Sequence, residues 1–123
     1  MKKLFLIIAI FFIAISVQAQ MYTFSHKRMT SLKNNIVQQS VEAISHDTLF
    51  IDGANVQLVL DGEFVEEKII STKIIPGFVR YTVPKITIDI PEVANPDRII
   101  FTMEPDKNKI AYQIVFYIEN IYR

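Results

Sequence analysis

The side chains best suited to metal or general-base chemistry are the two histidines, His26 and His46. Asp47 is adjacent to His46 and Asp52 follows shortly after, so an imidazole–carboxylate site can be drawn around them. Neighbouring residues in a strand point to opposite faces, and the side chains of His46 and Asp47 would therefore not converge. The sequence predicts no metal ligand set, and we interpret these residues as solvated positions at strand edges.

Other catalytic chemistry lacks its residues or its spacing. The chain has no cysteine, which excludes thiol catalysis and thiolate zinc sites. Asp52, Asp61 and Glu63 do not follow the spacing of a calcium-binding EF-hand, and turn formation accounts for the two aspartates. No serine or threonine has a visible base partner. We therefore predict a non-enzymatic protein without catalytic residues or a cofactor.

The charge balance argues against nucleic-acid binding. Thirteen basic residues match thirteen acidic ones, so the whole chain is formally neutral. The pair Lys27-Arg28, even with Lys33, is too short to form a nucleic-acid patch. We expect no nucleic-acid partner.

Aromatic residues supply the ligand-binding hypothesis. Small barrels often hold a ligand in their mouth, and the aromatic side chains exceed the simplest needs of a core. The speculative ligand-binding set is Phe50, Phe64, Phe78, Tyr81 and Phe116. In the competing interpretation these residues simply fill the core. A second functional hypothesis is a structural or protein-interaction role through an exposed edge strand or an aromatic patch, suggested by the Tyr- and Ile-rich segment 112–122. The identity of the ligand or partner and the oligomeric state are not predicted.

The elements that must position these residues are mainly strands. Asp52-Gly53 and Asp61-Gly62 separate apolar runs, which predicts a three-strand meander over Thr48–Ile51, Val56–Leu60 and a third strand from near Glu63. The third strand is expected to continue from Phe64 to Ile75, with a bulge or a bend at Glu66–Lys68. Further strands are predicted at 78–83, 85–90, 98–103 and 109–122. The last also fits helical spacing, but its β-branched and aromatic residues favour a strand.

One helix is expected, between Thr30 and Ser45. Leu32, Ile36 and Ile44 approximate a helical stripe, and Thr30 could cap it. Tyr22 and Phe24 suggest an opening strand before it, and a strand–loop–strand arrangement of residues 21–45 stays open. Taken together, the elements predict a single all-β domain over residues 20–123. We expect an antiparallel meander forming a small barrel or half-barrel, with a sandwich as the second choice and the helix over the opening.

The first nineteen residues read as a secretory signal. Lys2 and Lys3 precede an apolar run from Leu4 to Val17, which is shorter than the roughly 20 residues of a spanning helix. Val17 and Ala19 fit positions −3 and −1 of a cleavage site. We expect cleavage after Ala19, a periplasmic or extracellular domain and no permanent membrane anchor.

The signal, which ends Gln18-Ala19-Gln20, and the C-terminal segment from Tyr117 to Arg123 resemble small secreted β proteins of Bacteroidota or of their phages. The resembling proteins usually carry tryptophans before the meander, and this chain has none. No activity comes with the resemblance, which implies location and fold class only.

Overall fold

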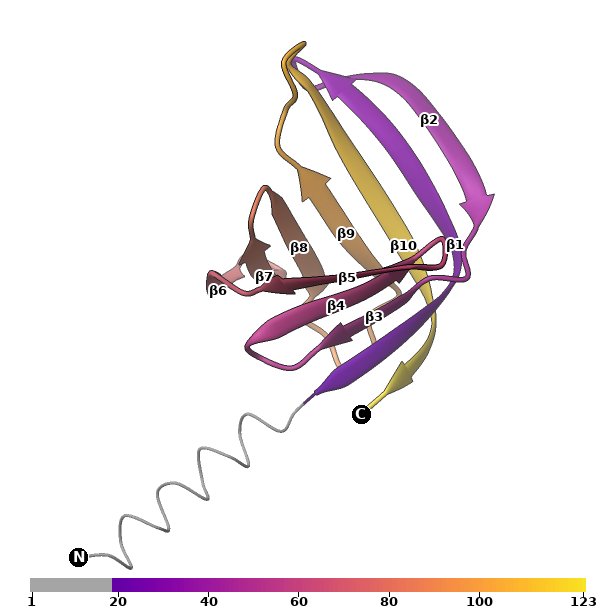
Figure 1. Cartoon of the computed structure of the whole chain (residues 1–123), viewed down its shortest axis with the longest axis vertical. Coiled ribbons are helices and arrows are strands. Elements are labelled where there is room, and N and C mark those ends of the chain that lie inside the picture. The colour runs from indigo at the N-terminus through magenta and orange to yellow at the C-terminus, as the bar shows by residue number, and fades with distance from the viewer. Residues whose placement is uncertain (1–18) are drawn as a thin grey trace, which may run out of the picture.

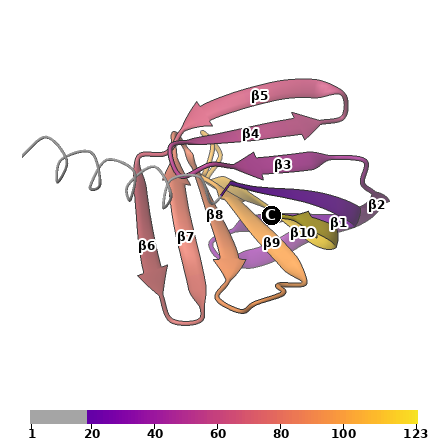
Figure 2. The same ribbon diagram turned by 90° about the horizontal axis from the view of Figure 1, so that it is seen from below.

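Ten antiparallel strands make up residues 19–123, the part of the chain that the computed structural model describes. They are β1 (Gln20–Lys33), β2 (Ile36–Ile44), β3 (Thr48–Ile51), β4 (Asn55–Leu60), β5 (Glu63–Lys68), β6 (Ser71–Ile75), β7 (Phe78–Val83), β8 (Ile86–Pro91), β9 (Arg98–Met103) and β10 (Ile110–Tyr122). The predicted all-β half-barrel is confirmed (Figures 1 and 2). The predicted signal segment lies outside the described residues, apart from Ala19.

The helix predicted between Thr30 and Ser45 is wrong. This stretch is a β-hairpin, in which β1 and β2 pair on either side of Asn34-Asn35. Both asparagines have positive φ, 54° and 63°, as a tight primed turn requires, and asparagine tolerates this region better than most residues. The strand–loop–strand arrangement that the sequence left open is the one that forms.

Asp61-Gly62 forms the tight turn that its sequence predicts. Asp61 has a φ of 50° and Gly62 a φ of 83°, and the flanking strands β4 and β5 pair directly from Leu60 and Glu63. Asp52-Gly53 also lies between paired strands, but its connection includes Ala54. There the Asp52 carboxylate accepts hydrogen bonds from the N–H groups of Ala54 and Asn55, at 2.9 and 2.7 Å.

The sheet follows the path β5-β4-β3-β1-β10-β9-β8-β7-β6, so β5 and β6 lie at its opposite ends although they are consecutive in sequence. The predicted single strand from Phe64 to Ile75 is therefore two strands, and the break near Lys68 is a crossing rather than a bulge. The Ile69 N–H donates to the Ala54 carbonyl at 2.8 Å, and the Ile70 N–H donates to the Thr82 carbonyl at 2.7 Å. Two consecutive residues thus connect the two ends of the curled sheet.

β1 has three partners. Its full length pairs with β10, while its other edge is shared by β3, opposite residues 20–23, and β2, opposite residues 26–33. Its pairing with β10 is irregular around Phe24, close to the point where the partner on the other edge changes. Beyond this point β1, β2 and β10 extend past the rest of the half-barrel (Figure 1).

Aromatic and aliphatic side chains fill the interior. The ring of Phe116 packs against those of Phe24 and Phe101, with centroids 4.8 and 5.0 Å apart. Leu49 and Ile99 are fully buried beside them. The centre of the half-barrel is therefore a packed core.

The outer face is polar. Directly paired residues form one row of hydroxyl and amide side chains across seven strands, namely Ser40, Thr30, Gln113, Thr102, Thr87, Thr82 and Ser71. Such cross-strand pairs stabilise the sheet modestly, at about 0.2–1 kcal/mol each, while this face stays solvated.

Candidate functional site

The five aromatic residues predicted to bind a ligand lie in different surroundings. Phe116 is in the core, Phe64 is 63% exposed on β5, and Phe50 and Phe78 are half-buried on β3 and β7. Tyr81, also half-buried, lines a pocket at one mouth of the half-barrel. The structure therefore does not gather the five around one cavity.

The two histidines also lie apart from any ligand set. The His26 ring stacks on Tyr117 with centroids 4.2 Å apart, and its Nδ1 lies 2.9 Å from the Ser25 hydroxyl. His46 is exposed in the connection between β2 and β3. Within residues 19–123, no three His, Asp or Glu side chains come close enough to hold a metal ion.

The interpretation of Asp47 as a solvated residue at a strand edge is wrong, because this residue is 2% exposed and belongs to a buried charged cluster. Its Oδ2 lies 3.0 Å from Lys27 Nζ and accepts a hydrogen bond from the Ser45 hydroxyl at 2.7 Å. Its Oδ1 accepts the N–H of Asp61 at 2.9 Å, and the Asp61 carboxylate approaches Lys27 at 3.3 Å. The cluster connects β1, the β2–β3 connection and the turn before β5, which gives it a structural role.

These contacts set the ionisation of Asp47 and Lys27. Burial alone would raise the pKa of Asp47, but the hydrogen bonds from Asp61, Ser45 and Lys27 and the Lys27 charge outweigh it and hold this pKa below its usual value. Burial alone would likewise lower the pKa of Lys27, but its two aspartate partners raise it overall. Both side chains therefore stay charged at neutral pH.

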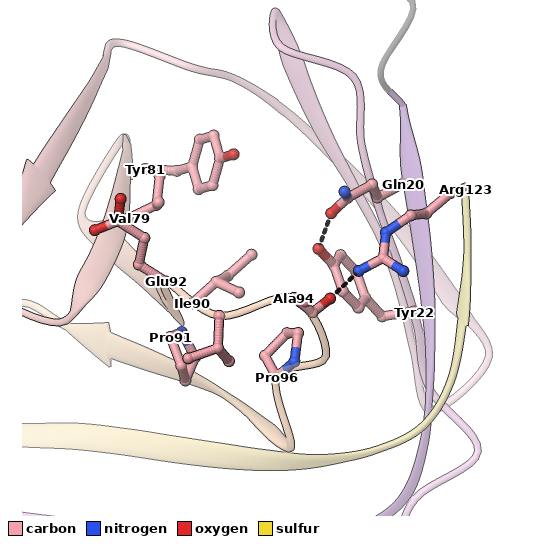
Figure 3. A pocket seen from close by; sticks show the side chains of 11 residues that line it. Gln20, Tyr22, Val79, Tyr81, Ile90, Pro91, Glu92, Ala94, Pro96 and Arg123 are labelled. Atoms are coloured by element: carbon pink, nitrogen blue, oxygen red, sulfur yellow. Dashed lines mark hydrogen bonds between the residues drawn. The ribbon is translucent and has the colours of Figure 1, made fainter.

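The pocket that Tyr81 lines, here called the mouth pocket, has a volume of about 360 Å³. Gln20 and Tyr22 of β1 and Arg123 lie on one wall, and Tyr81 lies opposite with its hydroxyl directed toward them (Figure 3). The β8–β9 connection completes the pocket, chiefly with apolar side chains that include Pro91 and Pro96, and with the exposed Glu92.

Hydrogen bonds hold one wall of the mouth pocket in place. The Tyr22 hydroxyl donates to the Gln20 side-chain oxygen, and Arg123 donates to the Ala94 carbonyl. Burial, reinforced by Tyr81, raises the pKa of Tyr22 to about 12 although Arg123 opposes this effect, and burial also raises the pKa of Tyr81. At neutral pH both phenols are hydrogen-bonding groups beside an apolar surface.

A second hollow, the hairpin groove, lies where β1, β2 and β10 extend past the core. Its volume is about 520 Å³, and its apolar lining includes Met29, Val41, Met103, Tyr112 and Ile114. Met29 pairs with Val41 on one side and Ile114 on the other, which places the three on one face. Ile114 is buried but Met29, Val41 and Tyr112 are exposed, so the core-facing side of the sheet continues uncovered into the hairpin.

β2 is also an edge strand. Within the described residues it pairs with β1 alone, and eight of its nine residues are exposed. It contains no lysine or proline, and its one charged residue, Glu42, already pairs with Arg28 at 2.7 Å. Edge strands usually carry such residues to prevent pairing with other chains.

The other two edges of the sheet differ from β2. Four of the six residues of β5 are charged, Glu63, Glu66, Glu67 and Lys68. The shorter β6 has Lys73 at its centre and is followed directly by Pro76. Charge and proline therefore protect these edges, whereas β2, the longest of the three, has only Glu42 and the register shift at Gln38.

Sequence reasoning missed the β2 edge because it favoured a helix there. The signal that could have found it is the Asn34-Asn35 pair, which tolerates a tight turn and is followed directly by the β-branched Ile36 and Val37. The mouth pocket is harder to foresee, because residues as distant in sequence as Gln20, Tyr81 and Arg123 form it.

Residues 19–123 contain no helix that is long and apolar enough to cross a membrane. Comparison with known proteins found no matching family model, no similar curated protein and no similar solved structure.

Proposed function

We propose that this protein is a small, exported, non-catalytic interaction module that binds an extended protein strand along the free edge of β2. The observation that carries the proposal is the contrast between this long edge, which has a single charged residue and no lysine or proline, and the shorter edges of β5 and β6. In strand addition the backbone of the edge supplies the hydrogen bonds, and flanking side chains supply specificity.

The hairpin groove supports the same function. Val41 and Met29 expose apolar surface beside the edge, on the side that continues the core. An added strand would place alternate side chains on this face, next to Val41. The interior described by residues 19–123 is filled with aromatic and aliphatic side chains, which favours interaction at an edge over binding inside the half-barrel.

A labelled peptide tests this proposal directly. The probe is a synthetic peptide with the sequence of residues 36–44, flanked by two lysines for solubility, and the readout is its fluorescence anisotropy. Saturable binding is expected for the wild-type domain, and Val41→Lys should weaken it at least tenfold because it places a charge on the edge.

Val65→Lys is the matched control. Val65 lies on the β5 edge and is 42% exposed, against 44% for Val41, and pairs with Leu58, which packs on the core. This variant should bind the peptide like the wild type. Equal weakening by both variants, or no binding by the wild type, would contradict the proposal.

The mouth pocket supports a second candidate function, the binding of a small amphipathic ligand. Two neutral phenols and a guanidinium converge there over an apolar surface, which suits a ring-bearing molecule with a polar or anionic group. This is the barrel-mouth hypothesis drawn from the sequence, with Tyr81 as the one predicted residue that lines the pocket.

Fluorescence of 1-anilinonaphthalene-8-sulfonate, an aromatic anion, tests the second candidate. Arg123→Gln and Tyr81→Leu should each weaken its binding severalfold, whereas Tyr112→Leu, in the hairpin groove, should not. The reverse pattern would place the dye in the groove and remove the support for a ligand in the mouth.

Export is part of the proposal, and the sequence of residues 1–19 supports it. The protein recovered from the periplasm or the medium should have the mass of a chain that begins at Gln20. A full-length mass in the membrane fraction would contradict cleavage.

A further inference from the structure

We infer that the strand bound by β2 is β2 of a second copy, paired antiparallel about a two-fold axis at Ser40. This inference rests on the proposed strand addition and names its partner. The resulting contact is isologous, so that each copy offers the same edge to the other and one closed dimer forms.

The register follows from overlap. An antiparallel pair centred on Ser40 places Ser40 opposite Ser40 and Val41 opposite Gln39 of the partner. The pairing is regular over residues 39–41, because β2 has a register shift at Gln38. Val41 and Gln39 lie on the same face of the strand, because their partners Met29 and Ser31 are two residues apart in β1. Paired side chains therefore meet on one side of the joined sheet.

Charge supports the same register. Glu42, the one charged residue of β2, would lie near Gln38 of the partner, the residue at the register shift of β2, whose amide can donate a hydrogen bond to a carboxylate. A shift that centres the pair on Glu42 would oppose two carboxylates, which is unfavourable. Without Lys2 and Lys3, residues 20–123 carry 11 basic and 13 acidic side chains, and a net charge of −2 raises little long-range repulsion between copies.

The hairpin groove becomes continuous in this arrangement. Gln39 and Val41 line the groove of each copy and form its border at the free edge. Pairing places the Val41 of one copy beside the Gln39 of the other on the same face. The two exposed apolar surfaces then adjoin across the axis, so the dimer covers the side of Val41 that a single copy exposes.

Single-cysteine variants test the register, because the natural chain contains no cysteine. Directly opposite residues in an antiparallel pair have Cα atoms about 4.5–5.5 Å apart, within disulfide range. Under mild oxidation with copper phenanthroline, Ser40→Cys should therefore form a covalent dimer. In Ile44→Cys the two thiols would be eight residues apart along the strands, about 27 Å, and no dimer should form.

Val65→Cys, on the β5 edge, is the control for disulfides that form by random collision. It should stay monomeric under the same oxidation. Sedimentation of the unmodified protein should show a dimer that Val41→Lys dissociates and Val65→Lys does not. Cross-linking of Ile44→Cys or Val65→Cys as fast as Ser40→Cys would overturn the inference. A monomer at all concentrations, with no Ser40→Cys cross-link, would overturn it too.

The proposed function has its own readout. If the peptide of residues 36–44 binds but no dimer forms, the β2 edge accepts a strand from a different protein, and the second copy is excluded as its partner. If neither the peptide nor a second copy binds, strand addition itself fails.

Discussion

Lys27 Nζ lies 3.0 Å from Asp47 Oδ2, and the two residues expose only 4% and 2% of their surface. Lys27 reaches this position from the core-facing side of β1, where its neighbour across the sheet is Phe116. A buried pair of this kind contributes little net stability over an apolar pair, but removal of one partner leaves an uncompensated charge.

Replacing Lys27 by Met should therefore destabilise the domain strongly. The expected loss is about 3–5 kcal/mol of unfolding free energy, measured by urea denaturation, because Asp47 remains buried without its cation. The double variant Lys27→Met/Asp47→Asn should lose less than the sum of the single losses. Arg28→Met, which removes the exposed pair with Glu42, should change the unfolding free energy little. If it loses as much stability as Lys27→Met, the loss reflects the removal of any positive charge rather than the burial of Asp47.

Stability should fall in acid because of Asp47. Its folded pKa is below the value of about 3.9 for an unfolded aspartate, so its contribution is present above that pH and is lost as pH falls through the folded pKa. Urea denaturation between pH 2 and 6 should show a weaker pH dependence for Asp47→Asn than for the wild type. Glu42→Gln should keep most of the dependence, and if it abolishes the dependence instead, the exposed pair is responsible.

Tyr22 should ionise at unusually high pH. With a pKa of about 12, it should titrate above the usual value near 10 in absorbance at 295 nm, and Tyr22→Phe should remove that late step. Since the folded pKa is raised, its contribution to stability is complete below about pH 10 and disappears as pH rises through 12. Titration of every tyrosine near pH 10 in the folded protein would show that the mouth pocket is open to water.

Gly62 tests the tight turn between β4 and β5. A Cβ added there meets no atom within 4 Å, so the cost of Gly62→Val comes from the positive φ of 83°. We expect a loss of about 1–3 kcal/mol by chemical denaturation. Thr87→Val, on the outer face in mid-strand, should be nearly neutral. If Gly62→Val is as stable as the wild type, residues 61–62 can adopt a different turn that does not need a positive φ at position 62.

Asn35→Gly should stabilise the β1–β2 hairpin. Glycine adopts the observed φ of 63° more readily than asparagine, and the Asn-Gly pair is the preferred sequence for this turn. Amide exchange in β2 should slow by severalfold. Faster exchange would indicate that the Asn35 side chain itself stabilises the turn.

Local patterns predicted much of this fold. The Asp61-Gly62 turn and the strand at 110–122 follow from turn chemistry and from β-branched residues. The stretch from Thr30 to Ser45 was misread because Leu32, Ile36 and Ile44 match a helical stripe, although they lie in two strands. Its free edge, and with it the proposed site, was therefore invisible.

Long-range pairing left no local signal at all. Lys27 and Asp47 are twenty residues apart, and nothing in either neighbourhood marks the other as a partner. The crossing at Ile69-Ile70 reads as an irregular strand until the two ends of the sheet are known. Tyr81 lines the mouth pocket because the curl of the sheet brings β7 opposite β1.

The pairing of β1 with β10 sets the order in which the domain can form. β1 is the first strand and β10 the last, and they pair from Met21 with Tyr122 to Lys33 with Ile110. A growing or emerging chain therefore exposes one long edge of β1 until residues 110–122 are free. Contacts of such separation are slow to form, so the domain remains an incomplete sheet until its last strand arrives.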